Sequence, residues 1–287
     1  MSDYDPGGGK PFSPEGPGED DDGPDGARMP LLDHLIELRN RLMISFAVML
    51  VAFAASYYFA EEIFGFLVQP LAEALDGQGQ RRLIYTALTE AFFTYLRIAF
   101  FAAAFISFPV IASQIWMFVA PGLYKNERRA FLPFLVATPV LFLAGAALAY
   151  YGVFPLAWKF FISFETVSGA TNLPIVVEPK VNEYLSLVMK LVLAFGLAFQ
   201  LPVLLTLLVR AGLVSAASLA RSRKYAILII FLVAAILTPP DVISQIGLAI
   251  PIILLFELSI WMARAVEKRR RQADEAENAD TGSDAGG

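Results

Sequence analysis

Six apolar runs dominate this chain, and they restrict its fold more than any other feature of the sequence. They cover residues 42–60, 91–113, 131–151, 185–209, 225–238 and 242–263. Because about 20 helical residues cross the hydrocarbon core of a bilayer, most of these runs are long enough to span a membrane. Of the 287 residues, 57% are hydrophobic and 17% are charged, against about 45–50% and about 25% in soluble domains. The sequence therefore predicts an all-α integral membrane protein with six transmembrane helices.

The last two runs are predicted to be short. At about 1.5 Å rise per residue, the 14 residues of 225–238 reach about 21 Å, which is less than a bilayer core of about 30 Å. Only the turn at 239–241 separates this run from the last one. Two interpretations remain: a short helical hairpin that thins the bilayer locally, which we favour, or a re-entrant segment.

The distribution of basic residues predicts the orientation. An even number of crossings places both ends of the chain on one side. That side holds sixteen of the 22 Lys and Arg, whereas the loops of the other side hold four and the spans hold two. By the positive-inside rule, both termini are cytoplasmic and the loops 61–90 and 152–184 face outward. The expected location is the bacterial cytoplasmic (inner) membrane.

Acidic tails flank the predicted membrane domain. Residues 1–28 carry eight acids and two bases and are rich in Gly and Pro, and residues 272–287 carry five acids and no base. Such segments have almost nothing to bury, so disorder is expected. We therefore divide the chain into a disordered acidic tail at 1–28, a six-helix transmembrane domain at 29–267 and a charged disordered tail at 268–287.

The residue types present exclude several kinds of chemistry. The chain has no Cys, which rules out disulfides, thiolate nucleophiles and cysteine-based metal sites. It has one His, His34, which rules out a multi-histidine metal site within the chain. No paired carboxylates, nucleophile–base pair or phosphate-binding loop is recognisable. The sequence predicts a protein that is not an enzyme, with no cofactor, no metal and no nucleic-acid partner.

Prolines interrupt most of the predicted spans: Pro109, Pro139, Pro202 and Pro251. Each removes a helical hydrogen bond and tends to bend its helix. The bends are either the ordinary kinks of membrane helices or parts of a curved, concave wall, and the sequence does not decide between the two.

Two basic residues lie about two turns inside the outer ends of their predicted spans, Arg97 and Lys190. Either they extend to the membrane surface, or they form ion pairs with Glu90 and Glu183, which stand seven residues before them. We expect the pairing and assign it a mainly structural role.

Gln200 lies deep in the fourth predicted span and needs hydrogen-bond partners that lipid cannot offer. Pro202 frees a backbone carbonyl near residue 198, which is one candidate partner, and a polar group on another helix is the alternative. Glu257 in the last span poses the same question with a charge.

Two cytoplasmic acids break the basic pattern of their side. Glu37 lies on the polar face of a predicted amphipathic surface helix before the first span, where Arg41 is four residues further on. Glu127 lies in a short basic loop before the third span. A local ion pair and a helix cap are the structural interpretations, and a binding site is the functional one.

Seven short stretches resemble the TatC family, the multi-spanning subunit of the twin-arginine protein translocase. They occur in the family's order between about residue 30 and residue 265, and together they are highly specific: HLIELR (34–39), VQPL (68–71), PGLYKNERR (121–129), FGLAFQLP (195–202), LTPPDVISQ (237–245), AIP (249–251) and FE (256–257). The resemblance implies six spans in a concave, glove-like bundle with both termini cytoplasmic.

The resemblance also implies a function, which is recognition of the Arg-Arg signal of an already folded cargo protein. In the family, the acids that match Glu37 and Glu127 receive the two arginines, and the aromatic that matches Phe118 lies near them. Leu123 and Phe118 are expected to hold the apolar part of the signal, and Arg39 belongs to the same matched stretch. A carboxylate binds the planar guanidinium in a bidentate manner, which lysine cannot reproduce.

Partner helices form the second implied contact. Thr238 and Gln245 match a family cluster that contacts the single-span proteins TatB and TatA, and we place Gln200 and Glu257 in the same group. Many members have glutamate where this chain has Gln200, which makes proton sensing at that position doubtful. Pro70 and Asp241 also match, with no role beyond structure assigned. The expected assembly includes further TatC copies and transport driven by the proton-motive force.

A secondary transporter of a small solute is the alternative function. It would use the polar residues within the spans, which are Arg97, Lys190, Gln200 and Glu257, together with the interrupted helices. Against it, the sequence shows no matching halves.

Overall fold

A computed structural model describes residues 28–75, 82–123, 132–163, 178–238 and 242–284. The chain divides into two compact units, residues 1–40 and 41–287, and each is described by itself. Predictions for the tail at 1–27 lie outside the described residues.

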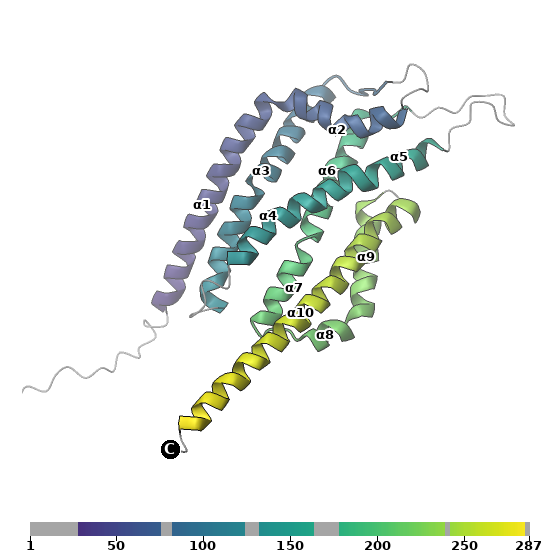
Figure 1. The fold of residues 1–287 in the computed structure, drawn as a ribbon. Coiled ribbons are helices and arrows are strands. Elements are labelled where there is room, and N and C mark those ends of the chain that lie inside the picture. Colours follow the sequence, from purple (N-terminus) through teal and green to yellow (C-terminus); the bar gives the residue numbers. More distant parts are fainter. Residues whose placement is uncertain (1–27, 76–81, 124–131, 164–177, 239–241, 285–287) are drawn as a thin grey trace, which may run out of the picture. The chain divides into compact units, whose positions relative to one another are not determined.

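The described residues are almost entirely helical (Figure 1). Their helices are α1 (Arg28–Tyr58), α2 (Ala60–Leu75), α3 (Glu90–Leu123), α4 (Leu132–Ala147), a π-helical segment η2 (Leu148–Val153), α5 (Phe154–Ile162), α6 (Val181–Ala198), α7 (Leu201–Arg210), α8 (Ala216–Arg221), α9 (Arg223–Leu237) and α10 (Val242–Asp284). In these ranges, β-pairing is limited to an isolated bridge between Ile84 and Lys180.

Five helical segments are long and apolar enough to cross a membrane, and they coincide with five of the six predicted spans. They are His34–Tyr58, Glu90–Phe118, Pro133–Ile162, Val181–Arg210 and Ser244–Arg269. This confirms a multi-pass, all-α membrane protein. The remaining predicted span is α9, which has 15 residues and reaches only about 22 Å. A count of six crossings, the concave shape and the orientation of the termini stay predictions.

Several helix boundaries differ from those expected. Helix α2, with 16 residues, lies almost entirely within the stretch predicted as an outward loop. The third span does not stop at residue 151, because η2 and α5 carry the helix on to Ile162. Helix α1 is uninterrupted from Arg28, where a separate surface helix was expected. Residues 268–284, which the sequence analysis assigned to the charged tail, continue α10 as helix to Asp284.

The four span prolines act differently. Pro139 and Pro251 lie inside α4 and α10, which continue through them. Pro202 stands just after a break, since α6 ends at Ala198 and α7 begins at Leu201. The break fits the missing N–H of proline and its steric conflict with the preceding turn. It places Gln200 at a helix junction rather than within a regular helix.

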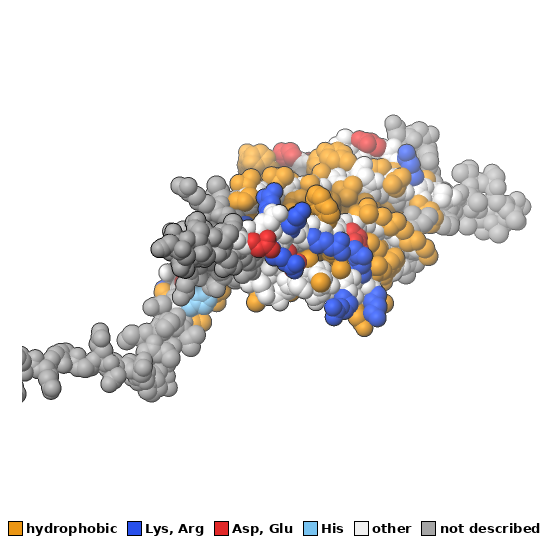
Figure 2. Space-filling view, turned by 60° about the horizontal axis from the view of Figure 1, so that its bottom comes forward, with side chains coloured by type: hydrophobic (Ala, Val, Ile, Leu, Met, Phe, Trp, Pro, Cys, Tyr) orange, Lys and Arg blue, Asp and Glu red, His pale blue; other side chains and the backbone are white. Residues whose placement is uncertain are grey.

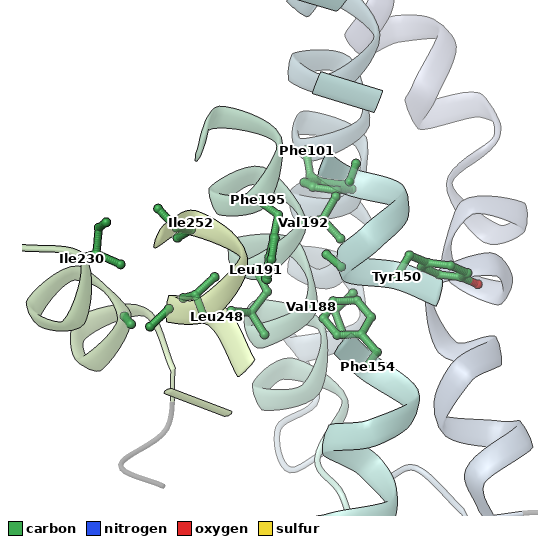
Figure 3. Close-up of a cluster of buried hydrophobic side chains, with 14 of the residues drawn as sticks. Phe101, Tyr150, Phe154, Val188, Leu191, Val192, Phe195, Ile230, Leu248 and Ile252 are labelled. Carbon is green, nitrogen blue, oxygen red and sulfur yellow. The ribbon is translucent and has the colours of Figure 1, made fainter. Parts of the chain in front are cut away.

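Helix α6 is the centre of the core (Figure 3). Its Val188, Leu191, Val192 and Phe195 are buried, and the close-up shows Phe101, Tyr150 and Phe154 on one side of this helix and Leu248 and Ile252 of α10 on the other. Helix α6 also packs along α4, and α10 packs against α7 and α9. Helices from distant parts of the sequence, α3, α4 and α10, therefore pack around α6.

Two glycines allow α4 and α6 to approach closely. A Cβ atom built on Gly145 would lie 2.5 Å from the backbone oxygen of Phe195, and one on Gly196 would lie 2.6 Å from the ring of Phe142. Small residues at helix contacts are typical of membrane bundles, in which van der Waals packing drives association.

Candidate functional site

The predicted signal-binding acid Glu37 lies on α1, and its side chain is 34% exposed. His34 Nδ1 lies 3.7 Å from its carboxylate, and the neighbouring Arg39 is exposed and donates to Asn40. A partly exposed carboxylate of this kind is accessible to a ligand that carries guanidinium groups.

The other residues of the predicted signal site belong to the second unit. Phe118 is half-buried near the end of α3, and Leu123 is the last residue of that helix. Glu127 lies outside the described residues, as do Asp241 of the last turn and the side chain of Leu123. The meeting of Glu37 with Glu127 and Phe118 therefore stays a prediction.

A hydrogen bond joins the same end of α3 to α1. Arg41 Nη1 donates to Gln114 Oε1 at 3.4 Å. On α1 itself, Ser45 Oγ donates to the Arg41 carbonyl at 2.9 Å. The sequence interpretation placed Arg41 only beside Glu37 and missed its contact across helices.

Gln200 is held by α4, not by its own helix. Its Nε2 donates to the backbone oxygen of Thr138 at 2.9 Å. The Thr138 hydroxyl donates to the Phe134 carbonyl at 2.8 Å and accepts from Trp116 Nε1 at 3.0 Å. Polar side chains thus link α3, α4 and the α6–α7 junction. Of the two partners considered from the sequence, the structure has the group on another helix and not the carbonyl near residue 198.

One atom of this polar group has no partner. Gln200 Oε1 is buried and accepts no hydrogen bond from any residue that the structure describes. An acceptor in this state is costly to bury. Among the described residues, this polar group therefore contains one buried acceptor without a donor.

Helices α9 and α10 form an antiparallel pair. Two of the predicted partner-contact residues, Gln245 and Glu257, lie on α10 and contact residues of α9. Gln245 Nε2 donates to the Phe231 carbonyl at 3.2 Å, and Arg223 Nη2 lies 2.7 Å from Glu257 Oε2. Glu257 is therefore paired with a cation that the sequence interpretation did not consider. The Thr238 hydroxyl is buried and donates to the Ala234 carbonyl of its own helix at 2.8 Å.

The predicted ion pairs of Arg97 and Lys190 are wrong. Arg97 donates to the side-chain oxygen of Asn182. Glu90 accepts from the backbone N–H groups of Thr86, Ala87 and Asn182 instead. Nearby backbone donors satisfy this carboxylate at the start of α3, so it does not reach two turns down its helix.

Glu183 is likewise engaged elsewhere, in a 3.3 Å pair with Lys180. Arg97 and Lys190 line one open groove between α1, α3 and α6. Lys190 and Gln200 are ten residues apart, which corresponds to about 15 Å along a helix. Glu257 forms its ion pair with Arg223 of α9. The four polar residues of the transporter alternative do not converge on one site.

Pro70 has a clear structural role in α2. Its missing N–H leaves the carbonyl of Phe66, four residues earlier, without its helical donor. The hydroxyl of Tyr150 donates to that carbonyl at 2.5 Å, and the hydroxyl of Tyr184 donates to the next one, Leu67, at 2.8 Å. Sequence reasoning missed both tyrosines, although the proline predicts a carbonyl that needs a donor.

Basic side chains gather at one end of the second unit. Figure 2 turns the lower end of Figure 1 forward and shows Lys and Arg side chains grouped on this face. The exposed basic residues of α8, α9 and the later part of α10 are Arg221, Arg223, Lys224, Arg264, Lys268, Arg269 and Arg271. Glu267 accepts from the N–H of Ala216 at 2.8 Å and ties α10 to the start of α8.

In the part of the chain that the structure describes, acidic and His side chains do not cluster as metal ligands do. Within the described ranges, no three of them lie close enough together to hold a metal ion.

Comparison with known proteins gives a consistent result. The sequence profile of the family described as Sec-independent protein translocase protein (TatC) matches residues 33–251. Proteins named Sec-independent protein translocase protein TatC are similar over most of this chain. The one from Magnetococcus marinus is 52% identical over 90% of this chain and 92% of its own length, and the one from Rickettsia prowazekii is 43% identical over 83% and 94%.

A solved structure shows the same fold. A crystal structure of a twin-arginine translocase receptor, TatC, superposes with a TM-score of 0.71 at 39% identity, covering 82% of this chain and 99% of that one. Both the sequence and the helical arrangement therefore match proteins of one family. This chain belongs to the TatC family of Sec-independent protein translocase proteins.

Proposed function

We propose that this chain is the receptor subunit of a twin-arginine translocase, which binds the Arg-Arg signal of folded cargo at the cytoplasmic membrane surface. The observation that carries the proposal is the family match over residues 33–251, because it includes both acids of the predicted signal site, Glu37 and Glu127. In this proposal the chain crosses the bacterial inner membrane six times, with both termini in the cytoplasm, and performs no catalytic step.

Two carboxylates suit an arginine doublet for a geometric reason. A guanidinium offers a planar fork of donors to each carboxylate, whereas the lysine ammonium acts as a compact point charge. Each hydrogen bond to a charged group contributes about 1.5–3 kcal/mol when shielded and far less when exposed. Glu37 and Glu127 together would therefore select Arg-Arg over Lys-Lys.

Apolar residues at the end of α3 would hold the rest of the signal. Phe118 is half-buried, so part of its ring is accessible. With Leu123, it would contact the hydrophobic side chains that follow the arginine doublet. Arg39 is exposed two residues after Glu37 and would belong to the same site, where it places a positive charge near the membrane surface.

Single-span helices of TatB and TatA are the second class of partner in this proposal. Gln200, whose Oε1 accepts no hydrogen bond from the described residues, would make a polar contact with such a helix. Thr238, Gln245 and Glu257 would offer a second contact along α9 and α10, where the Arg223–Glu257 pair is accessible on about two-fifths of each side chain. Several TatC copies with these helices would form the working complex, driven by the proton-motive force.

Crosslinking tests the assignment of the acids. An Arg-Arg signal peptide with a photoreactive residue next to the doublet is added to the full chain in lipid nanodiscs. Glu37→Ala and Glu127→Ala should each abolish the crosslink. Glu62→Ala, an exposed acid on α2, is the matched control and should leave it unchanged. Undiminished crosslinking in both acid variants would refute the site.

A further inference from the structure

An open groove of about 750 Å³ lies between α1, α3 and α6. Its lining includes Phe53 from α1, Arg97, Phe100 and Phe101 from α3, and Ser186 and Lys190 from α6. All three helices belong to segments that are apolar and long enough to cross a membrane. The groove is therefore a cavity at membrane depth that contains two cationic side chains.

Neither cation has a carboxylate partner among the described residues. Arg97 donates only to the neutral Asn182, and Lys190 makes no hydrogen bond or ion pair within the described part of the chain. The two acids that stand near them in sequence are used elsewhere, Glu90 by backbone N–H groups and Glu183 by Lys180. Both side chains are exposed, so an anion from outside the chain can reach and pair with them.

The polar groups of the groove form one stripe. Ser186 and Lys190 line the groove, and Asn182 lies one turn before them on the same face of α6, since the three are four residues apart. The Arg97 guanidinium donates to Asn182, which is the second residue of α6. The charge of Arg97 therefore lies closer to the amino-terminal end of α6 than the Cα atom of Arg97 does. Deeper along the same groove, the lining changes to Phe101, Ala104 and Leu193. One end of the groove is thus cationic and the other is apolar.

We propose that this groove binds an anionic phospholipid, with the headgroup phosphate between Arg97 and Lys190 and an acyl chain along the aromatic side chains of α1 and α3. A phosphate accepts the forked donors of arginine and the ammonium of lysine together. The cationic end of the groove matches the phosphate headgroup of a phospholipid, and the apolar end matches its acyl chain. Basic pockets between membrane helices favour such headgroups. The leaflet is the one at the amino-terminal ends of α3 and α6.

Native mass spectrometry of the full chain tests this proposal. The protein is purified from nanodiscs that contain equal amounts of phosphatidylglycerol and phosphatidylcholine, and the retained lipid is identified. Wild type should retain phosphatidylglycerol in preference. Arg97→Gln with Lys190→Gln should lower this retention at least about tenfold. Arg82→Gln with Lys159→Gln removes the same charge from two exposed residues outside the groove and should retain it as wild type does.

A second variant keeps both charges. Ala104→Phe fills the apolar end and should also lower phosphatidylglycerol retention, which tests the groove if the double charge variant does not fold. Equal retention in wild type and both groove variants would overturn the proposal. So would displacement of the lipid by millimolar inorganic phosphate, which would indicate a site for a free anion. Photo-crosslinking from position 186 to a single-span partner helix instead of lipid would overturn it as well.

Discussion

The hydroxyl of Tyr150 donates to the backbone oxygen of Phe66 at 2.5 Å, and this oxygen is the one that Pro70 leaves without a helical donor. The π-helical segment that carries Tyr150 thereby completes the hydrogen bonding of α2. The stacked rings of Phe66 and Tyr150, whose centroids are 4.4 Å apart, hold the two residues side by side. A proline in one helix and a tyrosine about 80 residues later act as one structural unit.

Removing this hydroxyl should destabilise the fold in a way that depends on Pro70. Tyr150→Phe leaves a carbonyl without a donor, which costs about 1–3 kcal/mol. With Pro70→Ala, residue 70 regains its N–H, so the same substitution should cost less. The measurement is the free energy of unfolding in detergent for the four members of the double-mutant cycle.

The neighbouring residue provides the control for this cycle. Tyr151 is 71% exposed, so Tyr151→Phe should change the free energy of unfolding little. An equal cost of Tyr150→Phe with and without Pro70 would contradict the coupling.

The close contact of α4 with α6 predicts an asymmetry between two glycines. Gly145→Ala places a methyl group 2.5 Å from the Phe195 carbonyl, and a backbone atom cannot move aside as a flexible side chain can. Such overpacking should lower the free energy of unfolding by about 1–3 kcal/mol. Gly247→Ala meets nothing within 4 Å and should be neutral or slightly stabilising, since alanine favours helix. Equal thermal midpoints for the two variants would show that α4 and α6 are not in close contact.

Gln200 should matter more for assembly than for stability. Gln200→Leu removes one hydrogen bond to Thr138 but also removes a buried oxygen without a partner. The free energy of unfolding should therefore change by no more than about 1 kcal/mol. Co-purification of TatB should nevertheless decrease.

Gln69→Leu supplies the comparison for Gln200, because Gln69 is an exposed amide on α2 that bonds to Glu73 at 2.8 Å. It should leave TatB binding unchanged. An intact TatB complex with Gln200→Leu would assign Gln200 a purely structural role.

The α9–α10 pair predicts where residue 240 faces. The chain contains no Cys, so Pro240→Cys introduces a single reactive thiol at the turn. If the two helices cross the membrane as a hairpin, a membrane-impermeant maleimide should label this thiol from outside intact cells. Labelling only after the cytoplasmic face is opened would mean that the segment is re-entrant.

Local sequence signals predicted the spans well, and contacts between helices poorly. Hydropathy is a property of consecutive residues, which is why five spans agree with the helices. Helix α2 was missed because its 16 residues are amphipathic and follow α1 after a one-residue interruption. The partners of Gln200 and Glu257 were missed because Thr138 and Arg223 meet them only through tertiary packing.

The incorrect ion pairs have a different cause. Glu90 and Arg97 have a helical spacing that permits an approach, but backbone N–H groups at the start of α3 lie closer to the carboxylate than the guanidinium does. Spacing along a helix cannot reveal such competition. The predicted signal site depends on Glu127, so its geometry stays a prediction from the sequence and the family.

The most direct test of the central claim is the affinity of the full chain in nanodiscs for a signal peptide with Arg-Arg and for the same peptide with Lys-Lys. We expect wild type to bind the Arg-Arg peptide at least about tenfold more tightly, which corresponds to about 1.4 kcal/mol, and expect Glu37→Gln with Glu127→Gln to remove the difference. Equal affinities of wild type for both peptides would contradict the account.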